Sequence, residues 1–220
     1  MILDIVLIVF GSIIAYLVFM LIIGARILRK FVHFPAPPFV AYFLDSKLRR
    51  KMQPPDKLIE RSGIVNNMTV LDNGCGNGAY TPFIARAVGD KGIVYALDIQ
   101  PKMLQKLKNK LSKPEFKDIT NIKTILGNAY ELPFDEHSID LICMITVLQE
   151  IPDKTKALKE VKRVLKTDGT LAITELLVDP DYPWKRTTIK SVTSTGFKLQ
   201  QVRGNLLNYT ITFVPDSSLL

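Results

Sequence analysis

The chain has 220 residues, 47% of them hydrophobic, and a formal net charge of +8. This length suits one globular domain with an appendage rather than two full domains. The basic excess is concentrated, because residues 24–51 hold seven lysines and arginines against one acidic residue. A nucleic-acid-binding domain is expected to spread its basic residues over its folded surface, so this distribution argues against a nucleic-acid partner and favours a membrane surface.

Cysteine and histidine are too few and too scattered for a disulfide framework or a metal site. Cys75 lies in a glycine-rich stretch, Cys143 lies in an apolar run, and His33 and His137 stand alone. None of these residues has the spacing of metal ligands, so we expect no metal.

The first apolar run, Ile5 to Ile23, has 19 residues and no charge. As a helix it would rise about 28 Å, close to the thickness of the hydrocarbon core of a bilayer. A cleaved signal peptide would need a basic start, a shorter apolar core and a small-residue cleavage site, and residues 24–26 supply a poor one. We therefore predict a single-pass transmembrane anchor over residues 1–25, with the rest of the chain in the cytoplasm.

A basic and aromatic juxtamembrane segment is predicted over residues 26–54. Prolines at positions 35, 37 and 38 prevent one continuous helix, and the aromatic residues around them are types that settle at the membrane–water boundary. Val40, Phe43, Leu44 and Leu48 then fall at helical spacing among basic residues. This pattern predicts an amphipathic helix on an anionic leaflet, or alternatively a linker helix packed on the domain that follows.

Residues 66–80 organise the rest of the chain. The apolar run from Met68 to Leu71 leads into Asp72 and then into glycines at 74, 76 and 78, and residues 79–88 are compatible with a helix. Strand, glycine-rich turn and helix in this order are typical of the nucleotide-binding start of a doubly wound α/β unit. The alternative is an ordinary strand-to-helix turn. The elements further along the chain decide between the two interpretations.

Apolar runs predict further strands at residues 93–97, 122–126, 140–145 and 170–174, with amphipathic helices between several of them. Residues 197–203 and 209–214 alternate as a closing pair of strands. The predicted fold is therefore an α/β domain over residues 55–220. It is a Rossmann-like, doubly wound, mostly parallel seven-stranded sheet with a final antiparallel strand, preceded by the transmembrane helix.

Several short runs carry a family resemblance. The run LDNGCGNG at residues 71–78 resembles the first motif of the class I S-adenosylmethionine-dependent methyltransferases of the type 11-like family. The runs GNA (127–129), LPF (132–134) and RVLKTDGT (163–170) resemble later motifs of the same family. Phosphate-binding loops carry Lys-Ser/Thr after the last glycine, and dinucleotide loops space their glycines differently. The resemblance covers residues 55–215 and is specific for the cofactor rather than for the acceptor.

The resemblance implies S-adenosylmethionine as the cofactor and a set of residues that hold it. An acid at the end of the second strand suits hydrogen bonding to both ribose hydroxyls, the next residue can pack on the adenine, and an amide at position 128 replaces the usual aspartate beside the adenine amino group. The predicted cofactor-binding residues are Asp72, Gly74, Cys75, Gly76, Gly78, Asp98, Ile99, Asn128, Ala129 and Thr146.

The acceptor side is expected beyond the fourth strand, at residues 146–153, because ligands bind outside the carboxyl ends of parallel strands. Many relatives have His-His or His-Glu before I-P-D, where this chain has Gln149-Glu150, so one possible base is missing. Methyl transfer needs alignment more than a covalent nucleophile or a metal. The acceptor-side candidates, each of which is also explained as a packed or solvated residue, are Tyr42, Tyr80, Gln149, Glu150 and Tyr182.

Anchor and motifs together predict a membrane-anchored methyltransferase with a cytoplasmic catalytic domain and a lipid or other hydrophobic small molecule as acceptor. A phospholipid headgroup amine is the first expectation and a quinone precursor the second. Two alternatives stay open: a membrane-tethered scaffold that binds the cofactor without turnover, and a tethered enzyme for a soluble substrate. The sequence does not indicate the oligomeric state.

Overall fold

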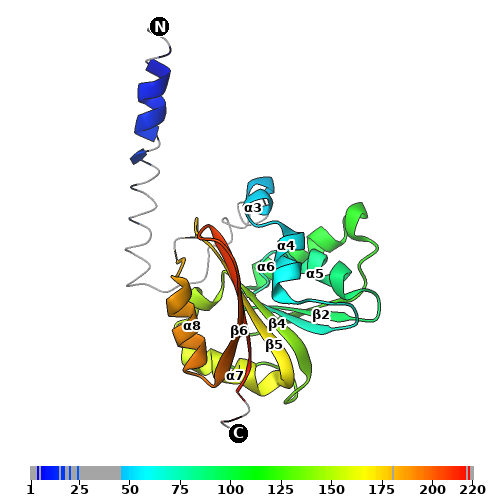
Figure 1. Ribbon diagram of the computed structural model, residues 1–220. Helices are drawn as coiled ribbons and strands as arrows, with labels where there is room; N and C mark the ends of the chain where they lie inside the picture. Colours follow the sequence, from blue (N-terminus) through cyan, green and yellow to red (C-terminus); the bar gives the residue numbers. More distant parts are fainter. Residues whose placement is uncertain are drawn as a thin grey trace.

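The computed structural model describes residues 4, 6–14, 16–17, 20, 24, 46–179, 181–216 and 218. From Ser46 onward these residues form one sheet with helices on both of its faces (Figure 1). The strands are β1 (Thr69–Asn73), β2 (Ile93–Asp98), β3 (Ile122–Leu126), β4 (Ile139–Ile145), β5 (Leu165–Leu176), β6 (Phe197–Gly204) and β7 (Asn208–Pro215). The helices are α3 (Lys47–Met52), α4 (Pro55–Ser62), α5 (Thr81–Val88), α6 (Pro101–Leu111), α7 (Lys154–Val164) and α8 (Lys185–Thr193).

The seven strands lie in the order β3-β2-β1-β4-β5-β7-β6. Strand β7 is antiparallel to both of its neighbours, and the other pairings are parallel. The predicted fold class, a mostly parallel seven-stranded sheet with one antiparallel strand, is therefore confirmed. From β1 the chain adds β2 and β3 on one side of the sheet, and from β4 it adds the later strands on the other side. This change of side creates a switch point at the carboxyl ends of the parallel strands β1 and β4.

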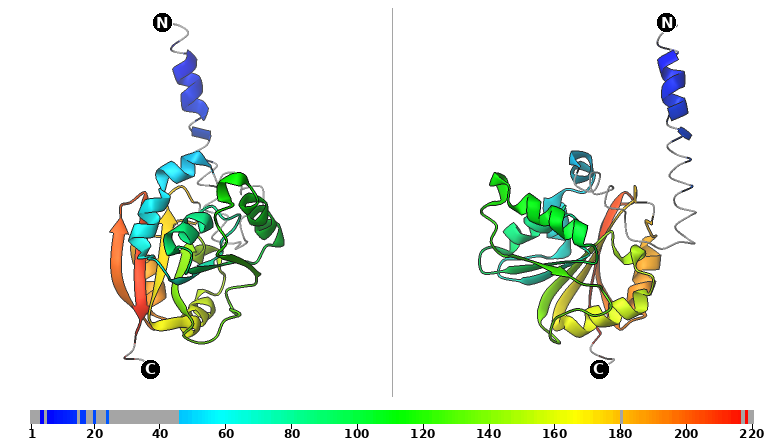
Figure 2. Two further views of the ribbon diagram at one scale, coloured as in Figure 1. Left: turned by 90° about the vertical axis from the view of Figure 1, so that its right-hand side faces the viewer. Right: turned by 180° about the vertical axis from the view of Figure 1, so that it is seen from behind.

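The two larger of three apolar clusters among the described residues fill the space on the two faces of the sheet. On one face α7 and α8 pack through Leu158, Val161 and Val192, and on the other α4 and α5 pack through Leu58 and Ile84. Figure 2 shows the same division, with α5 and α6 across the sheet from α7 and α8. Parallel strands covered on both faces are apolar along their length, which explains why the runs in the sequence predicted them.

The start of β5 differs from the prediction. We expected a strand over residues 170–174, but β5 begins at Leu165. Leu165 pairs with Ile139, and the register then shifts so that Thr170 pairs with Leu141. The intervening residues form an irregularity in the ladder, which depends on β4 and is not visible in the local sequence.

Helix α3 is docked against the carboxyl edge of the sheet. The Asn208 side chain donates a hydrogen bond to the Met52 carbonyl (2.6 Å), and the Tyr80 hydroxyl donates one to the Gln53 carbonyl (3.1 Å). The predicted amphipathic pattern is reversed here, because Leu48 is 59% exposed and Arg49 only 4% exposed. Contacts with the domain, rather than hydropathy, orient this helix.

The N-terminal prediction is tested only in part. The described residues from Asp4 to Gly24 are helical, whereas residues 25–45, Tyr42 included, and part of the run Ile5–Ile23 lie outside the described residues. Among the residues that the structure describes, no helix combines the length and apolar character needed to cross a bilayer. The expected transmembrane helix is thus not supported, and the boundaries at 25 and 54 stay predictions.

Asp72 links β1 to α5. Its carboxylate accepts a hydrogen bond from the Thr81 hydroxyl (2.6 Å), and both side chains are buried. Burial raises the pKa of Asp72 from 3.8 to about 6, against the lowering effect of the Thr81 bond and with a smaller raising effect from the charge of Asp98. The strand and the helix of the glycine-rich unit are therefore joined by an acid that is reluctant to ionise.

Replacing Asp72 with Asn should remove part of the pH dependence of stability. A carboxyl whose folded pKa is raised stabilises the fold below pH 4 and loses that contribution as the pH rises through about 6. The free energy of unfolding of the wild type, relative to Asp72→Asn, should fall by about 2–3 kcal/mol between pH 4 and pH 7. Urea unfolding of both proteins at several pH values measures this, and parallel pH curves would contradict it.

Candidate functional site

A cavity of about 280 Å³ lies at the carboxyl edge of the sheet. Its lining comes from the last residues of β1 and β2 and from the segments that follow β1, β2, β3 and β4, which meet at the switch point. The lining residues are Asn73, Gly74, Leu97, Asp98, Ile99, Gln100, Gly127, Asn128, Ala129, Tyr130, Val147, Glu150, Ile151 and Pro152.

The glycine-rich turn passes too close to its neighbours for side chains. Gly74 has φ of +84°, and a Cβ there would lie 2.6 Å from the methyl carbons of Val147. Gly78 has φ of +71°, and a Cβ there would collide with the side chain of Leu107. The N–H groups of Gly74 and Cys75 both donate to the Leu97 carbonyl, at 2.8 and 2.9 Å. The turn is thereby tied to the end of β2, and these two N–H groups serve the fold.

Asp98 ends β2 and presents its carboxylate to the cavity. One carboxylate oxygen accepts from the Gly76 N–H and the other from the Gln100 N–H, both at 2.8 Å. Burial raises the pKa of Asp98, and these backbone bonds counteract the rise. Each oxygen keeps a second lone pair, so the side chain is fixed in place and can still accept two hydrogen bonds from a ligand.

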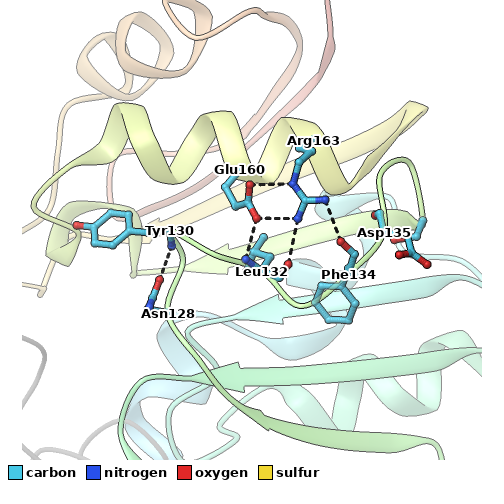
Figure 3. A network of polar contacts seen from close by, with 8 residues as sticks. Asn128, Tyr130, Leu132, Phe134, Asp135, Glu160 and Arg163 are labelled. Atoms are coloured by element: carbon cyan, nitrogen blue, oxygen red, sulfur yellow. Dashed lines mark hydrogen bonds and ion pairs between the residues drawn. The ribbon is translucent and has the colours of Figure 1, made fainter.

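The adjoining loop is held by helix α7 (Figure 3). Arg163 donates to the carbonyls of Leu132 (3.0 Å) and Phe134 (2.9 Å), and Glu160 accepts from the Leu132 N–H (2.8 Å). Within the loop the Asn128 side-chain oxygen accepts from the Tyr130 N–H at 2.8 Å. This network holds residues 132–134 on α7, directly after residues 127–130 of the cavity wall.

Asn73 was missed as a site residue. Its side chain is 1% exposed and lines the cavity, and its Nδ2 has no hydrogen-bond partner among the described residues. A buried amide donor is rarely left unpaired, so a ligand group that accepts a hydrogen bond is expected beside it.

Five of the predicted cofactor residues line the cavity: Gly74, Asp98, Ile99, Asn128 and Ala129. The other five do not line it; they are Asp72, Cys75, Gly76, Gly78 and Thr146. Of the acceptor-side candidates Glu150 lines the cavity, whereas Tyr80, Gln149 and Tyr182 do not. The segment 146–153 was expected at the site and supplies Val147, Ile151 and Pro152.

Burial raises the pKa of both cysteine thiols well above 9, so neither is suited to act as a thiolate. Within the described residues, no three His, Cys, Asp or Glu side chains are grouped so that they could hold a metal ion.

Comparisons with known proteins agree with this architecture. A family model described as a methyltransferase domain matches residues 64–208. The demethylmenaquinone methyltransferase of Staphylococcus aureus strain MRSA252 is 35% identical over 119 residues, which cover 54% of this chain and 47% of that protein. The protein of the same name from strain JH9 is 34% identical over 119 residues, with the same coverage. The chain therefore spans about half the length of the curated relatives that it matches.

Solved structures share the fold. The chain is similar to a SAM-dependent methyltransferase from Aquifex aeolicus, with a TM-score of 0.75, 24% identity, and coverage of 82% of this chain and 100% of that one. It is also similar to a putative S-adenosylmethionine-dependent methyltransferase from Methanococcus maripaludis, with a TM-score of 0.63, 19% identity, and coverage of 82% and 90%. At these identities the likeness concerns the fold.

The matched family model spans well over half of the chain and includes the whole glycine-rich unit and the cavity. The chain belongs to the methyltransferase-domain family, and solved S-adenosylmethionine-dependent methyltransferases share its fold.

Proposed function

We propose that this enzyme methylates a demethylated menaquinone or a closely related hydrophobic ring compound. The observation that carries the proposal is the 35% identity to a demethylmenaquinone methyltransferase. The apolar side chains of Val147 and Ile151 in the cavity wall support an acceptor of low polarity. From the sequence we expected a phospholipid headgroup amine as the first acceptor and a quinone precursor as the second. The identity to a demethylmenaquinone methyltransferase reverses this order.

The cavity residues fit S-adenosylmethionine. Asp98 would accept hydrogen bonds from the ribose hydroxyls, Ile99 would pack on the adenine, and Asn128 would contact the adenine edge. The unpaired Nδ2 of Asn73 would donate to an oxygen of the cofactor or of the acceptor. When bound, the cofactor supplies a methyl group on a positively charged sulfur, and the chain contributes alignment and exclusion of water.

Replacing Asp98 with Ala should weaken cofactor binding. Loss of hydrogen bonds to a charged group costs about 1.5–3 kcal/mol, equivalent to about a 10- to 100-fold rise in Kd. Asp90→Ala, an exposed aspartate in the turn before β2, is the matched control and should bind as the wild type does. Titration calorimetry on the folded proteins measures the Kd for S-adenosylmethionine. Equal Kd values for Asp98→Ala and wild type would show that Asp98 does not bind the cofactor.

The acceptor is tested with methyl-labelled cofactor and the full chain. Label should enter the quinone fraction when demethylated menaquinone is offered in detergent, and Asp98→Ala should reduce the yield. Label in phosphatidylethanolamine instead would favour the second acceptor. Label only in a water-soluble compound from a cell extract would favour an enzyme for a soluble substrate and contradict the proposal.

A membrane association is proposed alongside the acceptor. In the described helical residues near the N-terminus, ten large apolar side chains are between 47% and 67% exposed: Val6, Leu7, Ile8, Val9, Phe10, Ile13, Ile14, Tyr16, Leu17 and Met20. An exposed apolar surface of this extent needs a partner, and a bilayer would also hold a hydrophobic acceptor. The single-pass anchor remains the form that we propose.

Charged substitutions in this helix should release the protein from vesicles. Aspartate near the centre of a membrane helix costs about 2.5–3.5 kcal/mol, so Val9→Asp with Ile13→Asp should lower the bound fraction at least about tenfold. Val9→Leu with Ile13→Leu keeps the apolar surface and should bind as the wild type does. Co-sedimentation with vesicles measures binding, and equal sedimentation of both double variants would contradict the proposal.

A further inference from the structure

Beside the cofactor cavity, three buried polar side chains have atoms that lack a hydrogen-bond partner among the described residues. Arg49 is 4% exposed, Gln53 2% and Glu175 1%. Arg49 Nε, both polar side-chain atoms of Gln53, and Glu175 Oε1 have no hydrogen-bond partner among the described residues. Each such atom costs about 1–3 kcal/mol when it stays unpaired, so a bound molecule that pairs with them is expected.

The three side chains come from α3 and from the end of β5. Arg49 and Gln53 are one helical turn apart, and the Gln53 N–H donates to the Arg49 carbonyl at 2.8 Å. Arg49 Nη2 donates to the Thr146 hydroxyl at 2.8 Å, and the Thr146 N–H donates to the carbonyl of Thr174, the residue before Glu175, also at 2.8 Å. Arg49 thus lies at the paired ends of β4 and β5, where Glu175 is the next residue.

The cluster adjoins the cofactor cavity. Thr146 directly precedes Val147, whose side chain lines the cavity and contacts the glycine-rich turn. Thr146 has φ of +56°, a conformation that costs a β-branched residue about 1–3 kcal/mol and persists where the surroundings enforce it. The bond from Arg49 is one such constraint, so the backbone between cluster and cavity is held in one arrangement.

The raised pKa of Glu175 suits its carboxylate to accept a proton. Burial raises its pKa well above 4.5, the acidic neighbours raise it further, and Arg49 lowers it. The charged and titratable groups coupled to it are Arg49, Glu150, Lys154, Asp179, Asp181, Tyr182 and Tyr209. A carboxyl with a raised pKa is a better match to a weakly acidic hydroxyl at neutral pH than an ordinary glutamate is.

We infer that Arg49, Gln53 and Glu175 form an acceptor subsite that binds an acidic ring hydroxyl, and that Glu175 is the base that deprotonates it. The inference rests on the proposed function and narrows the acceptor to the reduced, dihydroxy form of the ring. Donors on Arg49 and Gln53 stabilise the oxygen that becomes negative.

The step balances without a further reagent. Glu175 takes the proton of the hydroxyl, and the electron pair left on the oxygen delocalises to the neighbouring ring carbon. That carbon forms the bond to the methyl group while the bond from sulfur to the methyl carbon breaks and its electron pair stays on sulfur. The hydrogen on the methylated carbon then leaves as a proton, which restores the aromatic ring.

Glu175→Gln keeps the shape of the side chain and removes the base. It should lower kcat about 10²- to 10⁴-fold and abolish the acidic limb of the pH–rate profile, with cofactor Kd within about twofold of wild type. Arg49→Met should raise the KM for the acceptor about tenfold or more. Arg50→Met on the same helix and Glu60→Gln on α4 are matched controls and should behave as the wild type does.

The full chain is assayed with labelled cofactor and demethylated menaquinone, either reduced to the diol or left oxidised, and thermal unfolding confirms that each variant is folded. The expected result is that the wild type methylates only the diol, that Glu175→Gln lowers kcat, and that Arg49→Met raises the KM for the acceptor. If wild type methylates the ring but Glu175→Gln keeps its rate and pH profile, the subsite is overturned and the proposed function stands. If wild type methylates no ring compound, the proposed function fails with it.

Discussion

The parallel pairing of β1 with β4 is the constraint on which the site depends. Val70 lies opposite Leu141 and Asp72 opposite Cys143, which places Asn73 and Thr146 at neighbouring strand ends. Strand order runs one way from β1 and the other way from β4, so the segments after them diverge and leave the cavity between them. The glycine-rich turn makes close approach possible there, because a side chain at position 74 would collide with Val147.

Three buried acids mark the same edge of the sheet, and burial is the first cause of the raised pKa of each. They differ in their donors. Asp72 has the Thr81 hydroxyl and serves the fold, and Asp98 has two backbone N–H groups and keeps lone pairs for a ligand. Glu175 Oε1 has no partner among the described residues. The donors around a buried carboxyl, more than its depth, therefore separate a structural role from a role in binding.

Helix α3 connects the N-terminal part of the chain to this edge. It is bound by Asn208 of β7 and by Tyr80, and it contributes Arg49 to the strand ends. The same segment follows the apolar residues that we propose to associate with a bilayer. A hydrophobic acceptor entering from a membrane would then meet a helix that belongs both to the N-terminal segment and to the proposed acceptor subsite.

Local sequence determined the elements of this protein. Apolar runs, prolines at helix starts and glycines at positive φ act through neighbouring residues, so the strands, most of the helices and the cavity residues Asp98 and Asn128 could be predicted. Tertiary structure decided the extension of β5 to Leu165, the burial of Arg49 and the unpaired amide of Asn73. Each of these depends on a partner strand or helix far away in the chain, and no periodicity within the segment itself encodes such a partner.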